Sequence, residues 1–208
     1  MSLKKTLIQQ LLDLPGESAH VEMFPLRTKT SDALKNIENY KVSAVLALVY
    51  EQGIDERIIV MERPEYDGNH SGQICFPGGR KEETDYTPLE AALRETYEET
   101  GITPDKIEIL GSLTSVYIPV SNYLVYPFVG HLDEPPVFNP DPREVKAMHS
   151  FSLTELFKPE NRIQTNVKSG KGLLIKNVPA FQIDQKIIWG ATALMLNEIR
   201  VMLERLNG

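Results

Sequence analysis

The stretch GGRKEETDYTPLEAALRETYEETGI, residues 78–102, contains three glutamates at helical spacing, Glu95, Glu98 and Glu99. Residues separated by three and four positions lie on one face of a helix, so the three carboxylates are expected to converge. Like charges on one face repel each other, whereas carboxylate oxygens are ligands that Mg²⁺ and Mn²⁺ prefer. A solvated acidic helix face is the plainer interpretation of such a cluster taken alone. The residues around the cluster therefore decide between the two.

The ends of this helix are marked in the sequence. Thr87 can cap the N-terminus of a helix that runs to Thr100, Pro88 suits its first position, and Gly101 can end it. Upstream, the tripeptide Pro77-Gly78-Gly79 permits a tight turn and a close approach of backbone to a ligand. The sequence thus predicts a turn that is followed, after a short loop, by the acidic helix.

Two neighbouring residues favour a metal site over a solvated face. Arg94 can bind a carboxylate with both arms of its guanidinium group and so orient it. The exposed carbonyl of Gly79 can supply a further oxygen ligand. Candidate metal ligands are accordingly Glu95, Glu98, Glu99 and Gly79, with Arg94 beside them and Gly78 as a candidate contact to substrate.

Together these residues resemble the signature of the Nudix hydrolases, in which a glycine, an acid, Arg-Glu, Glu-Glu and a second glycine recur at fixed intervals. Five residues separate Gly79 from Asp85, as in the family, but eight rather than seven separate Asp85 from Arg94. An extra residue in the loop before the helix accounts for this departure, which leaves the role of Asp85 open. The resemblance implies an α/β/α sandwich with a mixed β-sheet and a divalent metal cofactor, Mg²⁺ or Mn²⁺, bound by Glu95 and Glu99, with Glu98 close behind.

A second resemblance extends beyond the box, to the coenzyme A pyrophosphatase branch of the family. Three segments carry it: SGQICFPGG (71–79), SNYLVYPFVG (121–130) and IWGATALML (188–196). The branch usually has Arg followed by Ser or Ala, and a second basic residue beyond. Here Arg63 is present, but Pro64 and Gly68 occupy the other two places, so Arg63 and His70 are the candidate substrate contacts.

The mechanism that the resemblance implies is attack of water on one phosphorus of a diphosphate bridge. Divalent metal ions would neutralise charge and lower the pKa of the attacking water. A general base is also needed. The candidates are a metal-bound glutamate of the helix, Glu98 or Glu99, and Glu144 in the loop NPDPREVKAM, where the family often places a functional glutamate. For Glu144 a solvated loop acid is an equally good interpretation.

Outside the box, apolar patterning predicts a mixture of helices and strands. A short amphipathic helix is expected over residues 3–14 and a hairpin over 41–50 and 57–62. Further strands are expected over the following ranges: 106–118, 122–132, 173–178, 180–183 and 186–188. A C-terminal helix from 189 is expected to cover part of the sheet. We expect residues 1–40 to form an N-terminal helix and extension and residues 41–208 to form the Nudix hydrolase domain.

Composition limits the partners and the compartment. The formal net charge of −7 argues against nucleic acid as a partner, because such binding depends on clustered Lys and Arg. No stretch approaches the roughly 20 apolar residues of a membrane span. Cys75 is the only cysteine, which permits a reducing compartment, so a cytoplasmic protein with a small nucleotide substrate is expected. A homodimer is compatible with the sequence, which does not indicate one.

Three tyrosines, Tyr117, Tyr123 and Tyr126, have two possible roles. Each can stack on an adenine, but alternation along strands explains them equally well as structural residues. Cys75 lies between two apolar residues and is interpreted as a structural residue, not as a catalytic thiol.

Three functions remain open on the sequence. The first is cleavage of coenzyme A or acyl-coenzyme A to 3',5'-ADP and phosphopantetheine, which the subgroup segments favour. The second is hydrolysis of another nucleoside diphosphate derivative, such as ADP-ribose, NADH or a dinucleotide, which Pro64 and Gly68 favour. The third is a binding module that keeps the scaffold without catalysis, because a fold does not fix a function.

Overall fold

A computed structural model describes residues 2–65, 70–168 and 174–205. Within them, eight strands form one mixed sheet, in the order β3-β2-β1-β7-β5, and β4, β6 and β8 pair with β1, β7 and β2. These strands are β1 (Lys41–Gln52), β2 (Asp55–Glu62), β3 (Ile74–Cys75), β4 (Gly78–Arg80), β5 (Glu108–Ser112), β6 (Val116–Ile118), β7 (Tyr123–Leu132) and β8 (Ala147–Ser152). The predicted hairpin is confirmed as β1 and β2.

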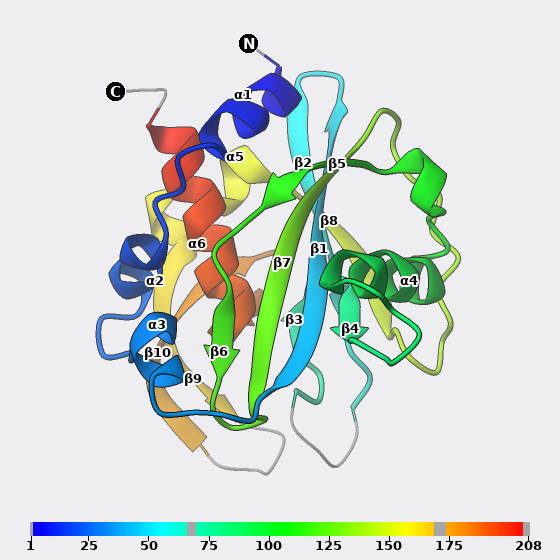
Figure 1. Cartoon of the computed structure of the whole chain (residues 1–208). Coiled ribbons are helices and arrows are strands. Elements are labelled where there is room, and N and C mark those ends of the chain that lie inside the picture. Colours follow the sequence, from blue (N-terminus) through cyan, green and yellow to red (C-terminus); the bar gives the residue numbers. More distant parts are fainter. Residues whose placement is uncertain (1, 66–69, 169–173, 206–208) are drawn as a thin grey trace.

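A second sheet and the helices complete the architecture. The second sheet runs β11-β10-β9, from β9 (Arg162–Lys168), β10 (Leu174–Ile183) and β11 (Lys186–Trp189). The helices are α1 (Leu3–Gln10), α2 (Glu17–Met23), α3 (Thr30–Leu34), α4 (Pro88–Thr100), α5 (Leu153–Leu156) and α6 (Gly190–Glu204), with 3₁₀ turns at Pro104–Lys106 and Pro159–Asn161. Figure 1 shows α4 on one side of the larger sheet and α6, with α1 and α2, on the other. The predicted α/β/α sandwich with a mixed sheet is confirmed.

Alternation along the strands sorts the core into two clusters. Successive side chains of a strand point to opposite faces, so Leu46 and Leu48 pack beneath α4, whereas Ala47 and Val49 pack on the α6 side. The α4 side is closed by Ala91 and Ala92, both fully buried. The two faces of β1 are thus both covered, which explains why the strand is apolar almost throughout.

Strand β1 is the structural centre of the larger sheet. It pairs in parallel with β7 along one edge, from Lys41 opposite Tyr123 to Tyr50 opposite Leu132. Its other edge is shared by β2, which pairs with the end of β1, and by β4, which pairs with the beginning. The turn that carries the two glycines is therefore fixed to the strand that joins both halves of the larger sheet.

The N-terminal segment is attached through a buried glutamate of α6. Glu198 is fully buried, and its carboxylate accepts hydrogen bonds from the Gly16 N–H at 3.2 Å, the Thr114 N–H at 3.1 Å and the Thr114 hydroxyl at 2.6 Å. The His20 ring lies 3.3 Å from the same carboxylate. One side chain thus joins the segment around α2, the β5–β6 connection and the last helix.

Some element boundaries differ from the sequence prediction. The strand predicted over 106–118 is two strands, β5 and β6, which both pair with β7. The register of β5 shifts between Ile109 and Gly111, and Gly111 has a positive φ, so the strand is bulged before the break. Helix α1 ends at Gln10, earlier than predicted, and strands β8 and β9 were not predicted.

Glu62 joins three elements at the end of β2. Its carboxylate accepts bonds from Lys146 at 2.9 Å, Lys186 at 2.6 Å and the His149 ring at 3.4 Å, and the residue is 7% exposed. Burial alone would raise the pKa of Glu62, but the bonds from Lys146, Lys186 and His149 lower it to about 2. Strands β2, β8 and β11 are therefore held together by one ionised carboxylate.

We expect Glu62→Gln to lower the free energy of unfolding by about 1 to 3 kcal/mol near neutral pH. Because the folded pKa lies below the unfolded value of about 4.5, this contribution is present above pH 4.5 and is lost as the pH falls toward 2. Urea unfolding of the wild type and the variant at several pH values measures it. Glu155→Gln, which breaks an exposed pair with Lys158, is the control and should cost under about 1 kcal/mol. A difference that does not depend on pH would contradict the assignment.

Candidate active site

The glycine turn lies against β1 without room for a side chain. Gly78 pairs with Val45 and Gly79 with Ala44. Gly78 has φ 140°, and a Cβ atom there would lie 2.3 Å from the carbonyl oxygen of Ala44. Only glycine permits this approach. In this position the Gly78 N–H donates a hydrogen bond to Glu99 of the acidic helix.

Helix α4 has the boundaries that the sequence predicts. The Thr87 hydroxyl accepts a hydrogen bond from the Glu90 N–H at 3.2 Å, and Pro88 is the first helical residue. At the other end, Gly101 has φ 76° and its N–H donates to the Tyr97 carbonyl at 2.8 Å. With one face against the sheet, the helix directs Glu95 and Glu99 toward the glycine turn.

Glu99 is the most buried of the three glutamates, at 3% exposure. Its carboxylate accepts a 2.7 Å hydrogen bond from the Gly78 N–H and lies 3.7 Å from the Arg63 guanidinium group. Burial raises the pKa of Glu99 to about 7; the charges of Glu95 and Glu144 add to the rise, while Arg63 and the Gly78 N–H oppose it. A carboxylate in this environment is one that a bound cation would strongly favour in its ionised form.

The carboxylate of Glu95 lies directly over Gly79. A Cβ atom on Gly79 would be 2.3 Å from the carboxylate carbon of Glu95, so the absent side chain is what makes space for the acid. Arg94 donates to Glu95 at 3.0 Å. Burial raises the pKa of Glu95, Arg94 lowers it, and the charges of Glu98 and Glu144 raise it further.

Arg94 is held by Asp85, whose role the sequence left open. The guanidinium group donates from Nε and Nη2 to the two Asp85 oxygens at 3.1 and 2.9 Å, and Nη2 also donates to the Arg80 carbonyl at 3.1 Å. Asp85 is 5% exposed, and Arg94 holds its pKa below the usual value. The extra residue of the loop does not prevent this bidentate bond.

The remaining acids lie at the edge of the site. Glu98 is about half exposed, and its carboxylate accepts a hydrogen bond from Arg94 at 3.2 Å. Glu144 is exposed and belongs to a turn in which its N–H donates to the Asp141 carbonyl at 3.0 Å. Its charge raises the pKa of both Glu95 and Glu99, so the loop brings it within electrostatic range of the helix.

Of the two side chains predicted to contact substrate, both among the described residues, Arg63 reaches the glutamates and His70 does not. Arg63 extends from the end of β2 into the site, where it donates to the Gly78 carbonyl at 3.3 Å. His70 has φ 70°, and its ring Nδ1 lies 3.0 Å from the side-chain oxygen of Gln73. In the described part of the chain, no hydrogen bond or ion pair joins His70 to the glutamates. Gly68 lies outside the described residues.

The donor set fits a hard divalent cation. It consists of carboxylate oxygens on one helix face beside a backbone turn, and burial and neighbouring negative charge raise the pKa of two of the acids, Glu95 and Glu99. Across residues 2–65, 70–168 and 174–205, no three acidic, His or Cys side chains already form a compact metal-binding group. Instead, the carboxylate of Glu95 is bonded to Arg94 and that of Glu99 to the Gly78 N–H.

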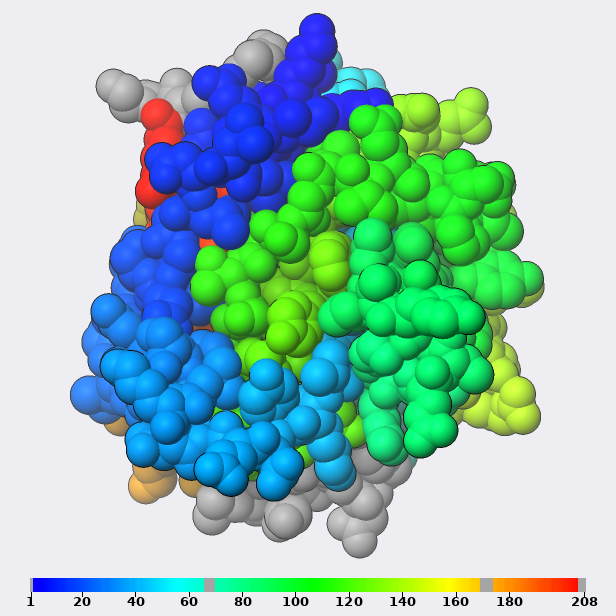
Figure 2. Space-filling model, in the orientation of Figure 1, coloured from blue at the N-terminus to red at the C-terminus, as the bar shows by residue number. Residues whose placement is uncertain are grey.

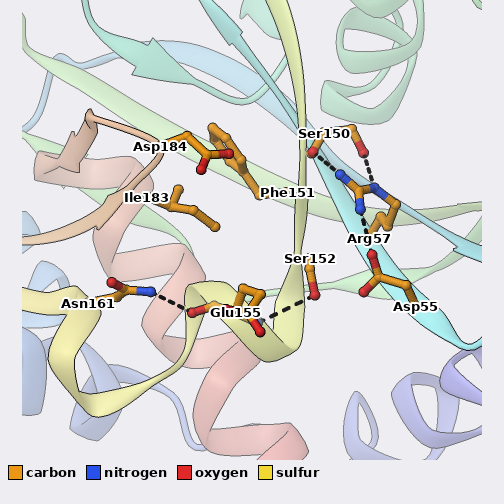
Figure 3. A pocket seen from close by; sticks show the side chains of 9 residues that line it. All are labelled: Asp55, Arg57, Ser150, Phe151, Ser152, Glu155, Asn161, Ile183 and Asp184. Carbon is orange, nitrogen blue, oxygen red and sulfur yellow. Dashed lines mark hydrogen bonds and ion pairs between the residues drawn. The ribbon is translucent and has the colours of Figure 1, made fainter.

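A cavity among the described residues lies away from this site. It measures about 510 Å³ and is lined by Arg57, Ser150, Phe151 and Asp184 among others. Figure 3 shows that Arg57 reaches both Ser150 and Asp55, so its charged group is already bonded within the cavity wall. Arg57 belongs to the beginning of β2, whereas Arg63 follows its end, so this cavity is separate from the glutamates.

The sequence from residue 40 to 169 matches the NUDIX domain, which is more than half of the chain, and the protein therefore belongs to the Nudix family. It is a Nudix hydrolase, as the acidic helix predicts. Nudix hydrolase 3 of Caenorhabditis elegans is 29% identical over 216 residues, which cover 96% of this chain and 84% of the relative. No helix among the described residues has the length and apolar character needed to cross a membrane.

Two further similarities bear on the branch and the fold. Human mitochondrial coenzyme A diphosphatase NUDT8 is 28% identical over 155 residues, covering 74% of this chain and 65% of the human protein. The chain thus spans just under two thirds of that relative's length. A MutT/nudix family protein of Enterococcus faecalis has a crystal structure that covers 94% of this chain and 74% of its own, with 15% identity and a TM-score of 0.50. The similarity to the Enterococcus structure supports the assignment of the fold.

Proposed function

We propose that the protein hydrolyses the diphosphate bridge of coenzyme A or acyl-coenzyme A, giving 3',5'-ADP and the corresponding 4'-phosphopantetheine. The observation that carries the chemistry is the pair of carboxylates at the glycine turn, Glu99 on the Gly78 N–H and Glu95 over Gly79. The similarity to the human coenzyme A diphosphatase supports the choice of substrate. The segment Phe76-Pro77-Gly78-Gly79 supports the same branch.

The proposed metal site uses Glu95, Glu98 and Glu99, with the carbonyl of Gly79 as a further oxygen ligand. Mg²⁺ or Mn²⁺ bound there would neutralise charge on the diphosphate and lower the pKa of the attacking water. Arg94 prepares the site because it holds Glu95 and Glu98 at 3.0 and 3.2 Å and is itself fixed by Asp85. The acids are thus oriented before any ligand arrives.

The substrate is proposed to lie between the helix and the end of β2. Arg63 places a cation 3.7 Å from Glu99, on the side of the site that β2 forms, where it can contact a phosphate of the substrate. The Gly78 turn allows the diphosphate to approach the backbone closely because no side chain intervenes. His70, in the loop that follows Arg63, is proposed as a second substrate contact.

Glu144 is proposed as the general base that accepts the proton of the attacking water, with Glu98 and Glu99 as the alternative bases. We expect Glu144→Gln to lower kcat by about 10² to 10⁴-fold at saturating metal, because a positioned base contributes that much. Steady-state kinetics measures it, and Glu134→Gln, which removes an exposed acid from the preceding loop, is the control. A near-normal kcat for Glu144→Gln would move the role of the base to the helix.

A different nucleoside diphosphate derivative is the second candidate. Pro64 stands where the coenzyme A branch usually has Ser or Ala, so the substrate contacts beyond Arg63 differ from that pattern. ADP-ribose, NADH and diadenosine polyphosphates contain the same type of bond. A binding module without catalysis is the third candidate, and the acids grouped at the glycine turn count against it.

Product analysis by liquid chromatography separates these candidates. Purified protein is incubated with Mg²⁺ or Mn²⁺ and, separately, coenzyme A, ADP-ribose, NADH and diadenosine polyphosphates. Release of 3',5'-ADP from coenzyme A by the wild type, and not by Glu99→Gln, is the expected result. Cleavage of another substrate alone would keep the chemistry and overturn the choice of coenzyme A. No cleavage of any substrate would favour the binding module.

A further inference from the structure

The fold distinguishes the three tyrosines to which the sequence assigns the same two possible roles, stacking on adenine or structural packing. Tyr123 lies on the α6 face of β7, where the Lys41 ammonium group sits 5.6 Å from its ring centre. Tyr117 is 7% exposed, and its hydroxyl donates to the Asn122 side chain at 2.9 Å. Both have structural partners that account for them. Tyr126 is the remaining one, and alternation along β7 directs it to the α4 face.

Tyr126 shares a row of the sheet with the glycine turn. Gly79 pairs with Ala44, and Ala44 pairs with Tyr126, so the three residues lie side by side on neighbouring strands. Paired residues direct their side chains to the same face, which is the face where Glu95 covers Gly79. Two strand spacings separate the tyrosine from the turn, or about 10 Å. A ribose can bridge this span between a diphosphate and its base.

The surface beside α4 is hollow at this point. Helix α4 packs on β4 and β1 and reaches only the margin of β7. Figure 2 shows a depression between α4, β6 and the segment before β1, with the yellow-green atoms of β7 at its floor. Phe128 lies on the same face of β7 as Tyr126, partly buried. Tyr40, at the rim, is 38% exposed.

Tyr126 and Tyr40 are neighbours in this depression. Burial raises the pKa of Tyr126, and the interaction with the neighbouring Tyr40 side chain raises it further. Like any tyrosine hydroxyl group, that of Tyr126 is neutral at physiological pH and can donate a hydrogen bond. The depression thus offers an aromatic floor, a second ring at its edge and hydroxyl groups that can bond to the edge of a base.

We propose that Tyr126, Tyr40 and Phe128 bind the adenine base of the nucleotide whose diphosphate lies at the acidic helix. The inference rests on the proposed function and specifies where the nucleoside half of the substrate binds. Stacking suits this surface because a planar base can lie on the parts of the aromatic rings that are not buried. A pantetheine chain would then leave the site on the opposite side, toward the end of β2.

Kinetics with four variants tests the proposal on whichever diphosphate the wild type cleaves. We expect Tyr126→Ala to raise KM by about 5- to 150-fold, the range for loss of one base stack, with little change in kcat. Tyr40→Ala should have a smaller effect in the same direction, and Tyr126→Phe should keep most of the affinity. Tyr123→Ala, on the opposite face of the same strand, is the matched control. An unchanged KM in Tyr126→Ala would overturn the proposal.

A binding measurement keeps the proposal independent of catalysis. Saturation-transfer NMR with 3',5'-ADP, full-length protein and no divalent metal should show saturation of the adenine protons. The effect should be lost in Tyr126→Ala and kept in Tyr123→Ala. If Tyr126→Ala does not fold, Tyr40→Ala, at an exposed position, gives the same test. If the wild type cleaves no diphosphate but still shows saturation of the adenine protons, the proposed function is refuted and the proposed base site is not. Saturation of the adenine protons that persists in both Tyr126→Ala and Tyr40→Ala would refute the proposed base site and leave the proposed function standing.

Discussion

Replacement of Glu99 by glutamine is expected to lower kcat by about 10³-fold or more, because it removes the charge of a proposed metal ligand. The same change should leave the fold intact. Glutamine can still accept the hydrogen bond from the Gly78 N–H, which is 2.7 Å long in the wild type. The variant therefore isolates the charge of Glu99 from its structural role.

The stability of this variant has a predicted sign. The pKa of Glu99 in the folded protein is about 7, above its ordinary value near 4.5, so the folded state binds more protons between these values. In metal-free protein the carboxylate thus costs stability as the pH rises from about 4.5 to about 7. At pH 8 without metal, Glu99→Gln should be at least as stable as the wild type in urea unfolding.

A control distinguishes the loss of this charge from the loss of any charge. Glu83→Gln changes the net charge equally at an exposed position of the same loop and helix unit. Its kcat should stay within about two-fold of the wild type, and its free energy of unfolding within about 0.5 kcal/mol. Glu99→Gln with kcat within ten-fold of the wild type at saturating metal would contradict the proposed role.

The two glycines of the turn should fail in different ways when each is replaced by alanine. At Gly78 the new Cβ atom would meet backbone, 2.3 Å from the Ala44 carbonyl oxygen, at a φ that alanine rarely adopts. At Gly79 it would meet the flexible end of Glu95. We expect Gly78→Ala to cost about 3 kcal/mol or more of stability, because strain and overpacking combine.

Gly79→Ala is expected to keep the stability within about 1 kcal/mol and to lower kcat by about 10²-fold, because Glu95 is displaced from its position. Urea unfolding and kinetics on the same two proteins test the pair. Gly53→Ala, in the hairpin turn, is the reference for a strained alanine, because its φ is 67° and nothing lies within 4 Å of the new Cβ atom. Equal losses of stability at Gly78 and Gly79 would contradict the assignment.

Local signals in the sequence were sufficient for the main elements of the site. Helix α4 is capped at Thr87 and ended at Gly101 as predicted, since both signals act within one turn of the helix. The hairpin of β1 and β2 is also local, and its apolar runs identify it. Membership of the Nudix family follows from the same segment, because its spacing reflects contacts within the turn and helix.

Contacts between distant segments could not be predicted in the same way. The sequence leaves the role of Asp85 open because the interval to Arg94 is one residue longer than the family's pattern, yet the loop absorbs the extra residue and keeps the bidentate bond. Strand β4 has three residues, two of them glycines, and gives no apolar pattern to detect. The break between β5 and β6 depends on a bulge, which a continuous apolar run conceals.

The parallel pairing of β1 with β7 has a consequence for the order in which the protein acquires activity. Parallel neighbours require a long crossover, and here the glycine turn and the glutamate helix both lie within it, between Lys41 and Tyr123. The entropy of closing so long a loop must be overcome before these contacts form, which makes such pairing slow. A chain emerging from the ribosome therefore exposes the segment of the acidic helix before β7, and the surface on which that helix packs is completed only when β7 arrives. Catalytic competence is then a late event of folding, and partly folded chains should be inactive even where the helix has formed.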